Sequence, residues 1–398
     1  MHPGIIVQHA KEIVRETETV RSDVLGVIGV VTRDRWPRGG SVGDFLELRL
    51  QTWDQLERNS GKLLFDAAAR RAVRGFFENG GEVCHLFGLL IETEQDLLEN
   101  DPFERLFHAL VDRLRGEEDL GLLCMPCLGY LPLTFQGNKP VVGGDPIWGM
   151  LLNHCEEMNN RFLIIDPPRE LHDQPLIDWV DDFKKRNKPV ASYGAVYYPW
   201  LMSGDEEFPP SGPIAGIYAR VENEHKPFGV GWPPANEVVR GVTHPSVQLR
   251  FREGGELTEH NINPVLTQPA RGVVVWGART LSTDPNWIHV NSRRVVSLVC
   301  EQVRRDSEWA VFENQTPELW SIITRIVRGR LDQMWSSGLL TGEAAGQDYL
   351  VKCDGETNPT ELRDAGQINV VIKLRPISTA EYILVELRLG ADGTSGGI

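Results

Sequence analysis

Between residues 24 and 198 the sequence alternates short apolar runs with longer amphipathic segments. The apolar runs indicate strands buried on both faces, and the segments between them repeat apolar residues every three or four positions, as helices do. Strands are predicted over 24–31, 83–91, 120–126, 161–165 and 190–198. Helices are predicted over 65–77, 103–115, 147–158 and 176–186. This alternation predicts an α/β layer with a largely parallel sheet.

The next region is more irregular. Residues 203–213 are rich in Gly, Pro and acidic side chains and are expected to form a surface loop. A helix is predicted over 214–222.

The stretch from 271 to 375 mixes strands and helices but holds no constellation of catalytic side chains. Residues 272–276 form an apolar run bounded by Gly, as in a strand buried on both faces. A helix is predicted with Ser292 as its N-cap, burying Val295, Val296, Val299 and Val303. Further strands are predicted over 309–312, 349–351, 368–374 and 382–389. This content favours packing and assembly over chemistry.

A second helix in this stretch has the stronger start signal. Thr316 is its predicted N-cap and Pro317 its first residue, because proline lacks the N–H that would be unpaired there. Gly338 is expected to end the helix in the left-handed conformation. The predicted buried stripe is Leu319, Ile322, Ile323, Ile326, Leu331, Met334 and Trp335. Three arginines fall outside this stripe: Arg325, Arg328 and Arg330.

Length and charge narrow the function classes. With 398 residues the chain is long enough for two domains. The net charge is −15, which argues against nucleic acid as a partner. From residue 266 onward 14 Lys and Arg face 16 Asp and Glu, a net of −2, so residues 1–265 carry the remaining −13. No apolar run approaches the roughly 20 residues that span a bilayer, and no secretion signal is visible, so we expect folding in the cytoplasm without membrane insertion.

The six cysteines are expected to be reduced thiols, since the chain shows no secretion signal. Cys124 and Cys127 form a C-x-x-C pattern, which occurs in zinc and redox sites, and the nearest further ligands are His154 and Cys155. Asp166 follows a predicted strand, where catalytic groups of α/β folds often lie. The sequence has no Gly-rich phosphate loop, serine elbow or paired histidines. Structural roles are therefore favoured, and an α/β enzyme with a Cys124/Cys127 zinc or redox site is the alternative.

Several segments, taken together and in order, resemble contractile tail sheath proteins, which occur in phage tails, R-type pyocins and extracellular contractile injection systems. They are Gly272-Val-Val-Val-Trp-Gly-Ala-Arg-Thr-Leu281, Trp287-Ile-His-Val-Asn-Ser-Arg-Arg294, Trp309-Ala-Val-Phe-Glu313, the helix end 331–342 and Val351-Lys-Cys-Asp-Gly-Glu-Thr-Asn358. The turn Phe76-Phe-Glu-Asn-Gly-Gly81 is also similar to one in these proteins.

The resemblance implies an α/β (α+β) fold with two domains and two linking arms. The expected parts are an N-terminal arm over 1–22, an outer α/β domain over 23–265, an inner mixed α/β domain over 266–376 that faces a tube, and a C-terminal arm and tail over 377–398. The arm positions expected to pair with neighbouring subunits are Ile5, Ile6, Val7, Ile383, Val385 and Leu387. The alternative for 382–389 is an internal strand of a closed sheet.

The function implied by this resemblance is mechanical. Copies of the chain would form a helical polymer around an inner tube and contract to drive the tube through a target envelope, without catalysis and without a cofactor. Implied partners are further copies of the chain, the tube protein, and baseplate and tail terminator or cap proteins. The particle would assemble in the cytoplasm as a phage tail or tail-like injection particle. A non-contractile shell or baseplate protein of the same fold is a further alternative.

Arg325, Arg328 and Arg330 are the candidate contacts to an acidic tube surface, because they lie on the polar side of a helix in a nearly neutral domain. The alternative is a solvated helix face.

Overall fold

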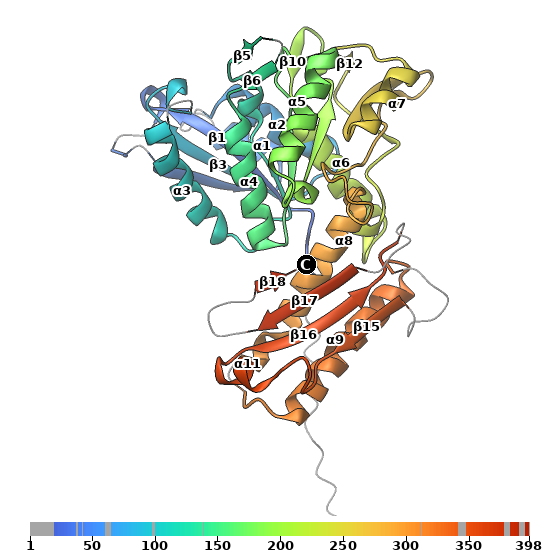
Figure 1. Ribbon diagram of the computed structural model, residues 1–398. Coiled ribbons are helices and arrows are strands. Elements are labelled where there is room, and N and C mark those ends of the chain that lie inside the picture. The colour runs from blue at the N-terminus through green and yellow to red at the C-terminus, as the bar shows by residue number, and fades with distance from the viewer. Residues whose placement is uncertain are drawn as a thin grey trace, which may run out of the picture.

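The computed structural model describes residues 20–36, 39–41, 43–59, 65–97, 100–137, 139–311, 313–340, 348–377, 383–389 and 395–397. It has a larger body built on a nine-stranded sheet and a smaller body built on a four-stranded sheet (Figure 1). Helix α8 (Val290–Ser307) runs from the first body into the second.

The large sheet has the order β11-β14-β13-β8-β7-β4-β1-β3-β2. Neighbouring strands from β13 to β3 are parallel, and antiparallel strands lie at both edges. The parallel strands are β1 (Leu25–Thr32), β3 (Cys84–Ile91), β4 (Leu122–Cys124), β7 (Phe162–Ile165), β8 (Gly194–Tyr198) and β13 (Ile262–Gln268). The antiparallel strands are β2 (Phe45–Leu50) at one edge, and β14 (Gly272–Val275) followed by β11 (Glu237–Val238) at the other. The predicted α/β layer and its largely parallel sheet are confirmed.

Helices cover both faces of this sheet. Successive residues of a strand point to opposite faces, and accordingly Leu122 and Leu123 of β4 belong to different apolar clusters. One face packs against α3 (Asn100–Arg115), α4 (Asp145–Met158) and α5 (Asp173–Arg186). The other packs against α2 (Ala67–Glu78) and α6 (Ser211–Glu224). The large body also contains α1 (Trp53–Asn59), α7 (Phe251–Glu259), the hairpin of β5 (Leu133–Gln136) and β6 (Lys139–Val142), and the small sheet of β10 (Glu206–Phe208), β9 (Leu201–Ser203) and β12 (His244–Pro245).

The prediction of a surface loop over 203–213 is wrong for residues 208–213, whereas residues 204–206 are exposed at the turn between β9 and β10. Residues 208–213 are buried, and α6 begins at Ser211. The reason is close helix packing: a Cβ on Gly212 would lie 2.4 Å from the Cα of Ala72 in α2. Glycine here therefore lets two helix backbones touch, which composition alone does not distinguish from loop sequence.

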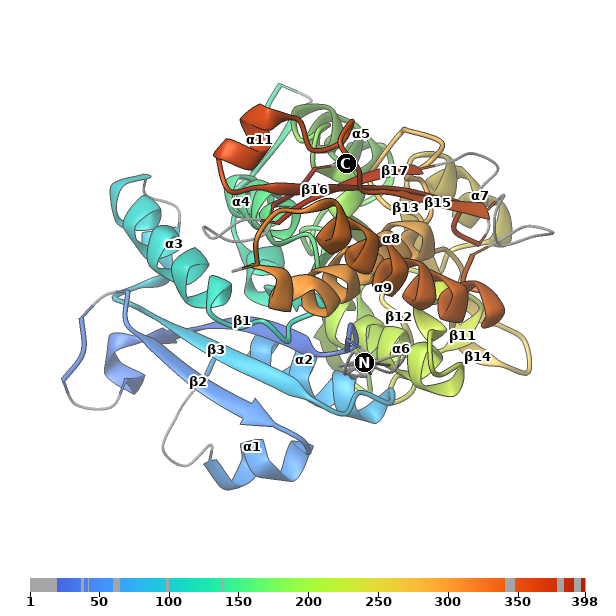
Figure 2. The same ribbon diagram turned by 90° about the horizontal axis from the view of Figure 1, so that it is seen from below.

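The small body is a helix layer under an antiparallel sheet (Figure 2). Its strands are β15 (Tyr349–Lys352), β16 (Ile368–Leu374), β17 (Ile383–Leu389) and β18 (Ser395–Gly397), in that order across the sheet. α8 and α9 (Pro317–Ser336) pack against the inner face of this sheet, and the short α11 (Thr360–Asp364) precedes β16.

The start and end predicted for α9 are confirmed. The side chain of Thr316 accepts a hydrogen bond from Leu319 N, Pro317 is the first helical residue, and Gly338 has a φ of 79°. The buried stripe differs in part: Trp320 and Val327 are buried, whereas Ile322 is 38% exposed.

Two predictions near α8 are wrong. The helix begins at Val290 with His289 as its N-cap, and Ser292 lies buried inside it. Residues 308–310 form a 3-10 helix where a strand was predicted, while Phe312 is outside the described residues. The buried apolar residues of α8 and of the 3-10 helix belong to the same apolar cluster. An apolar run that becomes buried is therefore not necessarily a strand.

The strand predicted over 272–276 is β14, and its three valines are buried. It pairs with β13 and with β11 in the large sheet. The residues 266–275, which the resemblance places in the inner domain, thus share the sheet of the larger body.

Candidate functional site

The N-terminal arm positions Ile5, Ile6 and Val7 lie outside the described residues, but the base of this segment is firmly held. Val20 N donates a hydrogen bond to Gln302 Oε1 at 2.9 Å. Arg294 Nη2 donates to the carbonyl oxygen of Ser22 at 2.9 Å and to Glu222 at 2.8 Å, and Ser22 Oγ donates to Glu222 Oε1 at 2.7 Å. We call Ser22, Glu222 and Arg294 the arm clamp.

The arm clamp is buried between the two bodies. Arg294 is only 4% exposed, and its guanidinium lies 5.0 Å from the centre of the Tyr218 ring. A Cβ on Gly121 would lie 2.1 Å from Ser22 O, so the chain passes tightly against the large body. The clamp therefore joins Ser22 to both α6 and α8. Sequence reasoning missed it, although Arg293 and Arg294 directly precede the apolar run from Val295 to Cys300.

Strand β17 carries the other predicted arm positions. Ile383, Val385 and Leu387 pair opposite Leu374, Ile372 and Val370 of β16 in the same chain. β17 also pairs with β18, so within this chain it is an internal strand of an open four-stranded sheet. At the opposite edge of the sheet, Leu350 of β15 is 48% exposed, so an apolar edge strand faces outward.

The three candidate arginines of α9 have different surroundings. Arg330 forms an ion pair with Asp306 at 2.8 Å, and both side chains are largely buried. Arg325 and Arg328 are exposed, and their spacing of three places them on one face of the helix. Arg328 also donates to Val351 O at 3.4 Å. The structure thus groups Arg325 with Arg328 and gives Arg330 an internal partner.

Cys124, Cys127, Cys155 and His154 are buried in the large body. Cys124 and Cys127 are buried, and burial raises the pKa of the Cys124 thiol well above its usual value. His154 Nε2 lies 2.7 Å from Arg161 Nη1. Burial first, and then the charge of Arg161, lower the pKa of His154 to about 3. Among the described residues, Cys124, Cys127, His154 and Cys155 do not come together as a set of metal ligands, and each packs within the large body.

Asp166 acts as a remote helix cap. Its Oδ1 accepts a hydrogen bond from Ser211 N at 2.8 Å, at the first turn of α6. The carboxyl is fully buried, and burial raises its pKa to about 7. The position after a strand, which suggested a catalytic aspartate, is used here to fasten a helix to the sheet.

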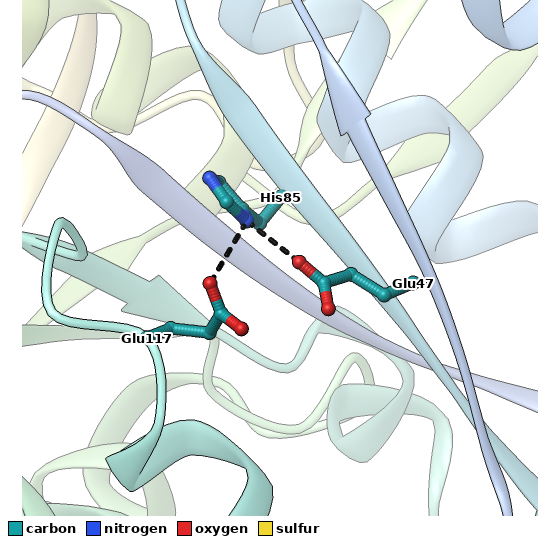
Figure 3. Close-up of side chains that lie close together, drawn as sticks. All are labelled: Glu47, His85 and Glu117. Carbon is teal, nitrogen blue, oxygen red and sulfur yellow. Dashed lines mark hydrogen bonds and ion pairs between the residues drawn. The ribbon is translucent and has the colours of Figure 1, made fainter.

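Glu47, His85 and Glu117 form a cluster at the edge of the large sheet (Figure 3). His85 Nδ1 lies 3.0 Å from Glu47 Oε1 and 3.8 Å from Glu117 Oε2. Two carboxylates and an imidazole are a donor set that divalent metals use. However, the guanidinium of Arg113 contacts Glu47 and lies 2.7 Å from Glu117. Arginine thus already supplies the positive charge, and the cluster ties β2, β3 and the end of α3 together. Nothing in the sequence pattern pointed to it.

No helix among the described residues has the length and apolar character needed to cross a bilayer.

Comparison with known families gives two adjacent matches. The phage tail sheath protein central domain matches residues 150–281, and the phage tail sheath C-terminal domain matches residues 282–390. Together they span more than half of the chain. Their junction falls just after Leu281, whose N–H bonds to Gly194 of β8, and before the chain enters α8.

Similar curated proteins are also sheath proteins. A putative prophage major tail sheath protein of Pseudomonas aeruginosa strain UCBPP-PA14 is 23% identical over 224 residues, which is 55% of this chain and 55% of that protein. The tail sheath protein of Enterobacteria phage T4 is 22% identical over 183 residues, which is 45% of this chain and 27% of the phage protein. The matches thus span about half of the first relative and about a quarter of the second.

Solved structures share the fold over almost the whole chain. The sheath complex of an extracellular contractile injection system, PVC, in its contracted state superposes with a TM-score of 0.72 at 24% identity and covers 96% of each chain. A chain of the anti-feeding prophage baseplate gives 0.70 at 24% identity, covering 96% of this chain and 97% of that one.

Proposed function

The chain belongs to the phage tail sheath family, and from this premise we propose that it is the structural subunit of a contractile tail sheath. Many copies would wrap an inner tube as a helix and shorten together to drive the tube through a target envelope. The observation that carries this proposal is the arm clamp. It anchors the N-terminal segment at the junction of two bodies, where a link to a neighbouring copy can move both.

We assign the linking role to the two ends of the chain. The segment 1–22, with Ile5, Ile6 and Val7, would add a strand to the small sheet of a neighbouring copy, where the β15 edge offers an apolar surface. Strand β17 would exchange from β16 of its own chain to β16 of a neighbour, because the same pairing register can be made in either way.

Contraction in this proposal needs no nucleotide. The assembled sheath would be held in an extended arrangement of higher free energy, and a trigger at one end would let subunits reorient into a lower one. Strand links would keep neighbours connected during the change. Further partners would be the baseplate and a terminator or cap protein, with assembly in the cytoplasm as part of a phage tail or tail-like particle.

The tube contact is assigned to the exposed face of α9 that carries Arg325 and Arg328. Charge reversal of both, R325E/R328E, should reduce co-sedimentation of sheath with tube, since two attractive charges become repulsive. The matched control is R240E/R252E, which makes the same charge change at two exposed positions of the large body. If the α9 variant co-sediments with the tube as well as the control does, the tube contact is contradicted and this face of α9 is only a solvated helix face.

The test of the whole proposal is electron microscopy of the full chain at low and high salt. Long hollow cylinders with helical striations are expected. If the sheath contracts, the cylinders should show two different axial lengths for the same number of subunits. Cylinders of one fixed length per subunit would support a non-contractile shell. Small monodisperse particles at every salt concentration would overturn the assembly role and return attention to the enzyme alternative.

A further inference from the structure

A groove of about 570 Å³ lies beside the N-terminal turn of α8, in a region that the proposed function does not use. Its walls come from the end of α4, from residues 188–193 before β8, and from the loop 282–287. Arg293 of α8 lies at the groove. Trp287 and Arg293, which belong to the segment 287–294 that resembles sheath proteins, therefore line a groove large enough for a small ligand.

Arg293 is a buried cation without a carboxylate partner. It is 1% exposed, and its guanidinium carbon lies 4.4 Å from the ring centres of both Tyr193 and Trp287. One hydrogen bond leaves it, from Nη2 to Asn159 Oδ1 at 3.3 Å, and its buried Nε–H has no acceptor. Within the described part of the chain, no Asp or Glu oxygen reaches ion-pair distance of Arg293. A buried charge is costly without an opposite charge, so Arg293 would stabilise an anion placed beside it.

The remaining lining fits an anion at this place. Ser192, Ser282 and Thr283 contribute hydroxyl groups, and Lys188 adds an exposed ammonium at the rim. Hydroxyl and cationic donors together are suited to a carboxylate. The groove also contains Asp284, but its Oδ1 accepts from Asn286 N at 2.9 Å and is committed to its own turn. Glu156 also lines the groove, and its side chain is exposed.

We propose that this groove binds a carboxylate group and that, in the assembled sheath, the carboxylate is an Asp or Glu side chain of a neighbouring copy. The identity of the neighbour rests on the proposed function. Residues 1–265 carry a net charge of −13, so the larger body of every copy presents many acidic side chains. Arg293 belongs to α8, which runs into the small body, and it packs on Tyr193 of the large body. A carboxylate of a neighbouring copy bound at Arg293 would therefore contact both bodies of the subunit.

The carboxylate site is tested first on the unassembled chain by calorimetric titration with glutarate at constant ionic strength. Saturable binding is expected, and Lys188→Glu should weaken it about tenfold by removing one charge-assisted contact. Lys185→Glu is the matched control, since Lys185 is exposed near the end of α5 and does not line the groove. Absence of saturable binding, or an equal loss in both variants, would overturn the site.

The neighbouring copy is tested separately by sedimentation of assembled sheath. Lys188→Glu should lower the sedimentable fraction, while Lys185→Glu leaves it at the wild-type level; unchanged thermal unfolding confirms that both variants fold. If glutarate binds but K188E assembles normally, a free carboxylate is the ligand and the neighbour is excluded. If the wild-type chain forms no sheath, the proposed function fails, and the glutarate titration still decides the groove.

Discussion

Buried ionisable side chains fasten the elements of this protein to one another. Arg161, only 1% exposed, donates to Leu114 O at 2.7 Å at the C-terminal end of α3 and to His154 of α4. A cation at a helix C-terminus is favourable because it meets the negative end of the helix dipole. Asp166 joins the end of β7 to α6, because its Oδ1 accepts a hydrogen bond from Ser211 N. These residues resemble a catalytic set by type, but each one is used to join two elements.

Asp166 makes stability depend on pH. Its pKa is raised from 3.8 to about 7, so the folded state favours the protonated carboxyl. The stabilising contribution is therefore fully present below the unfolded pKa and is lost as pH rises toward 7. With about 1.4 kcal/mol for each pH unit between these two pKa values, the loss amounts to about 4 kcal/mol. Asp166→Asn keeps the acceptor for Ser211 N and should remove this loss. Urea unfolding of both proteins from about pH 4 to about pH 8 measures it; parallel pH profiles would contradict the assignment.

At the scale of elements, helix ends and helix contacts follow short-range rules. α9 starts at Thr316 and Pro317 and stops before Gly338, as the local sequence dictates. The α2–α6 contact depends instead on one glycine in each helix that lies close against the other helix. Gly212 touches Ala72, and a Cβ on Gly75 would lie 2.6 Å from the Pro213 ring.

Removing the cap of α9 should cost about 1 kcal/mol of unfolding free energy. Thr316→Ala deletes the oxygen that accepts from Leu319 N at 3.3 Å, whereas Thr316→Ser keeps it. Urea unfolding of the two variants isolates the hydrogen bond. A loss of the same size in both would mean that the threonine methyl group, and not the cap, stabilises the helix start.

Gly212→Ala should destabilise the large body by about 1–3 kcal/mol, because the added methyl group forces two helix backbones apart. The control is Gly255→Ala in α7, where a Cβ would meet nothing within 4 Å. That change should be neutral or stabilising by up to about 1 kcal/mol, since alanine favours the helix. Thermal unfolding of both variants provides the measurement. Equal effects would show that α2 and α6 can separate at no cost.

At the scale of the whole molecule, α8 connects the large body, the small body and the base of the N-terminal segment, which are the parts that move in the proposed mechanism. Its first turns pack with the large body, its later turns with α9 and the small sheet. The arm clamp adds the base of the N-terminal segment to this junction. A pull on one end of the chain would therefore reach both bodies through a single helix.

Glu222→Gln should destabilise the protein by about 3–5 kcal/mol, because Arg294 would remain buried without its carboxylate. It should also loosen residues 20–23, whose amide hydrogen exchange should accelerate. Glu224→Gln, exposed on the same helix, is the matched control and should change neither quantity. Slow exchange at 20–23 in the Glu222 variant would show that Val20 and Gln302 suffice to hold the arm base.

The sequence by itself determined the α/β alternation, the caps of α9 and the family resemblance, because apolar periodicity and capping act within a few residues. It also supplied the candidate arginines of α9, although the ion pair of Arg330 was invisible to it. Ile5, Ile6 and Val7 remain predictions outside the described residues.

Only the tertiary structure decided which sheet β14 joins, why residues 208–213 are buried, and what Arg293 and Arg294 contact. The physical reason is distance along the chain. Ser22 and Arg294 are 272 positions apart, and a single buried arginine carries no local signal of its partner. Strand partners likewise depend on which apolar faces meet after collapse, and many pairings satisfy the same pattern. The parts of this protein that a sheath would need to move are held by those long-range contacts.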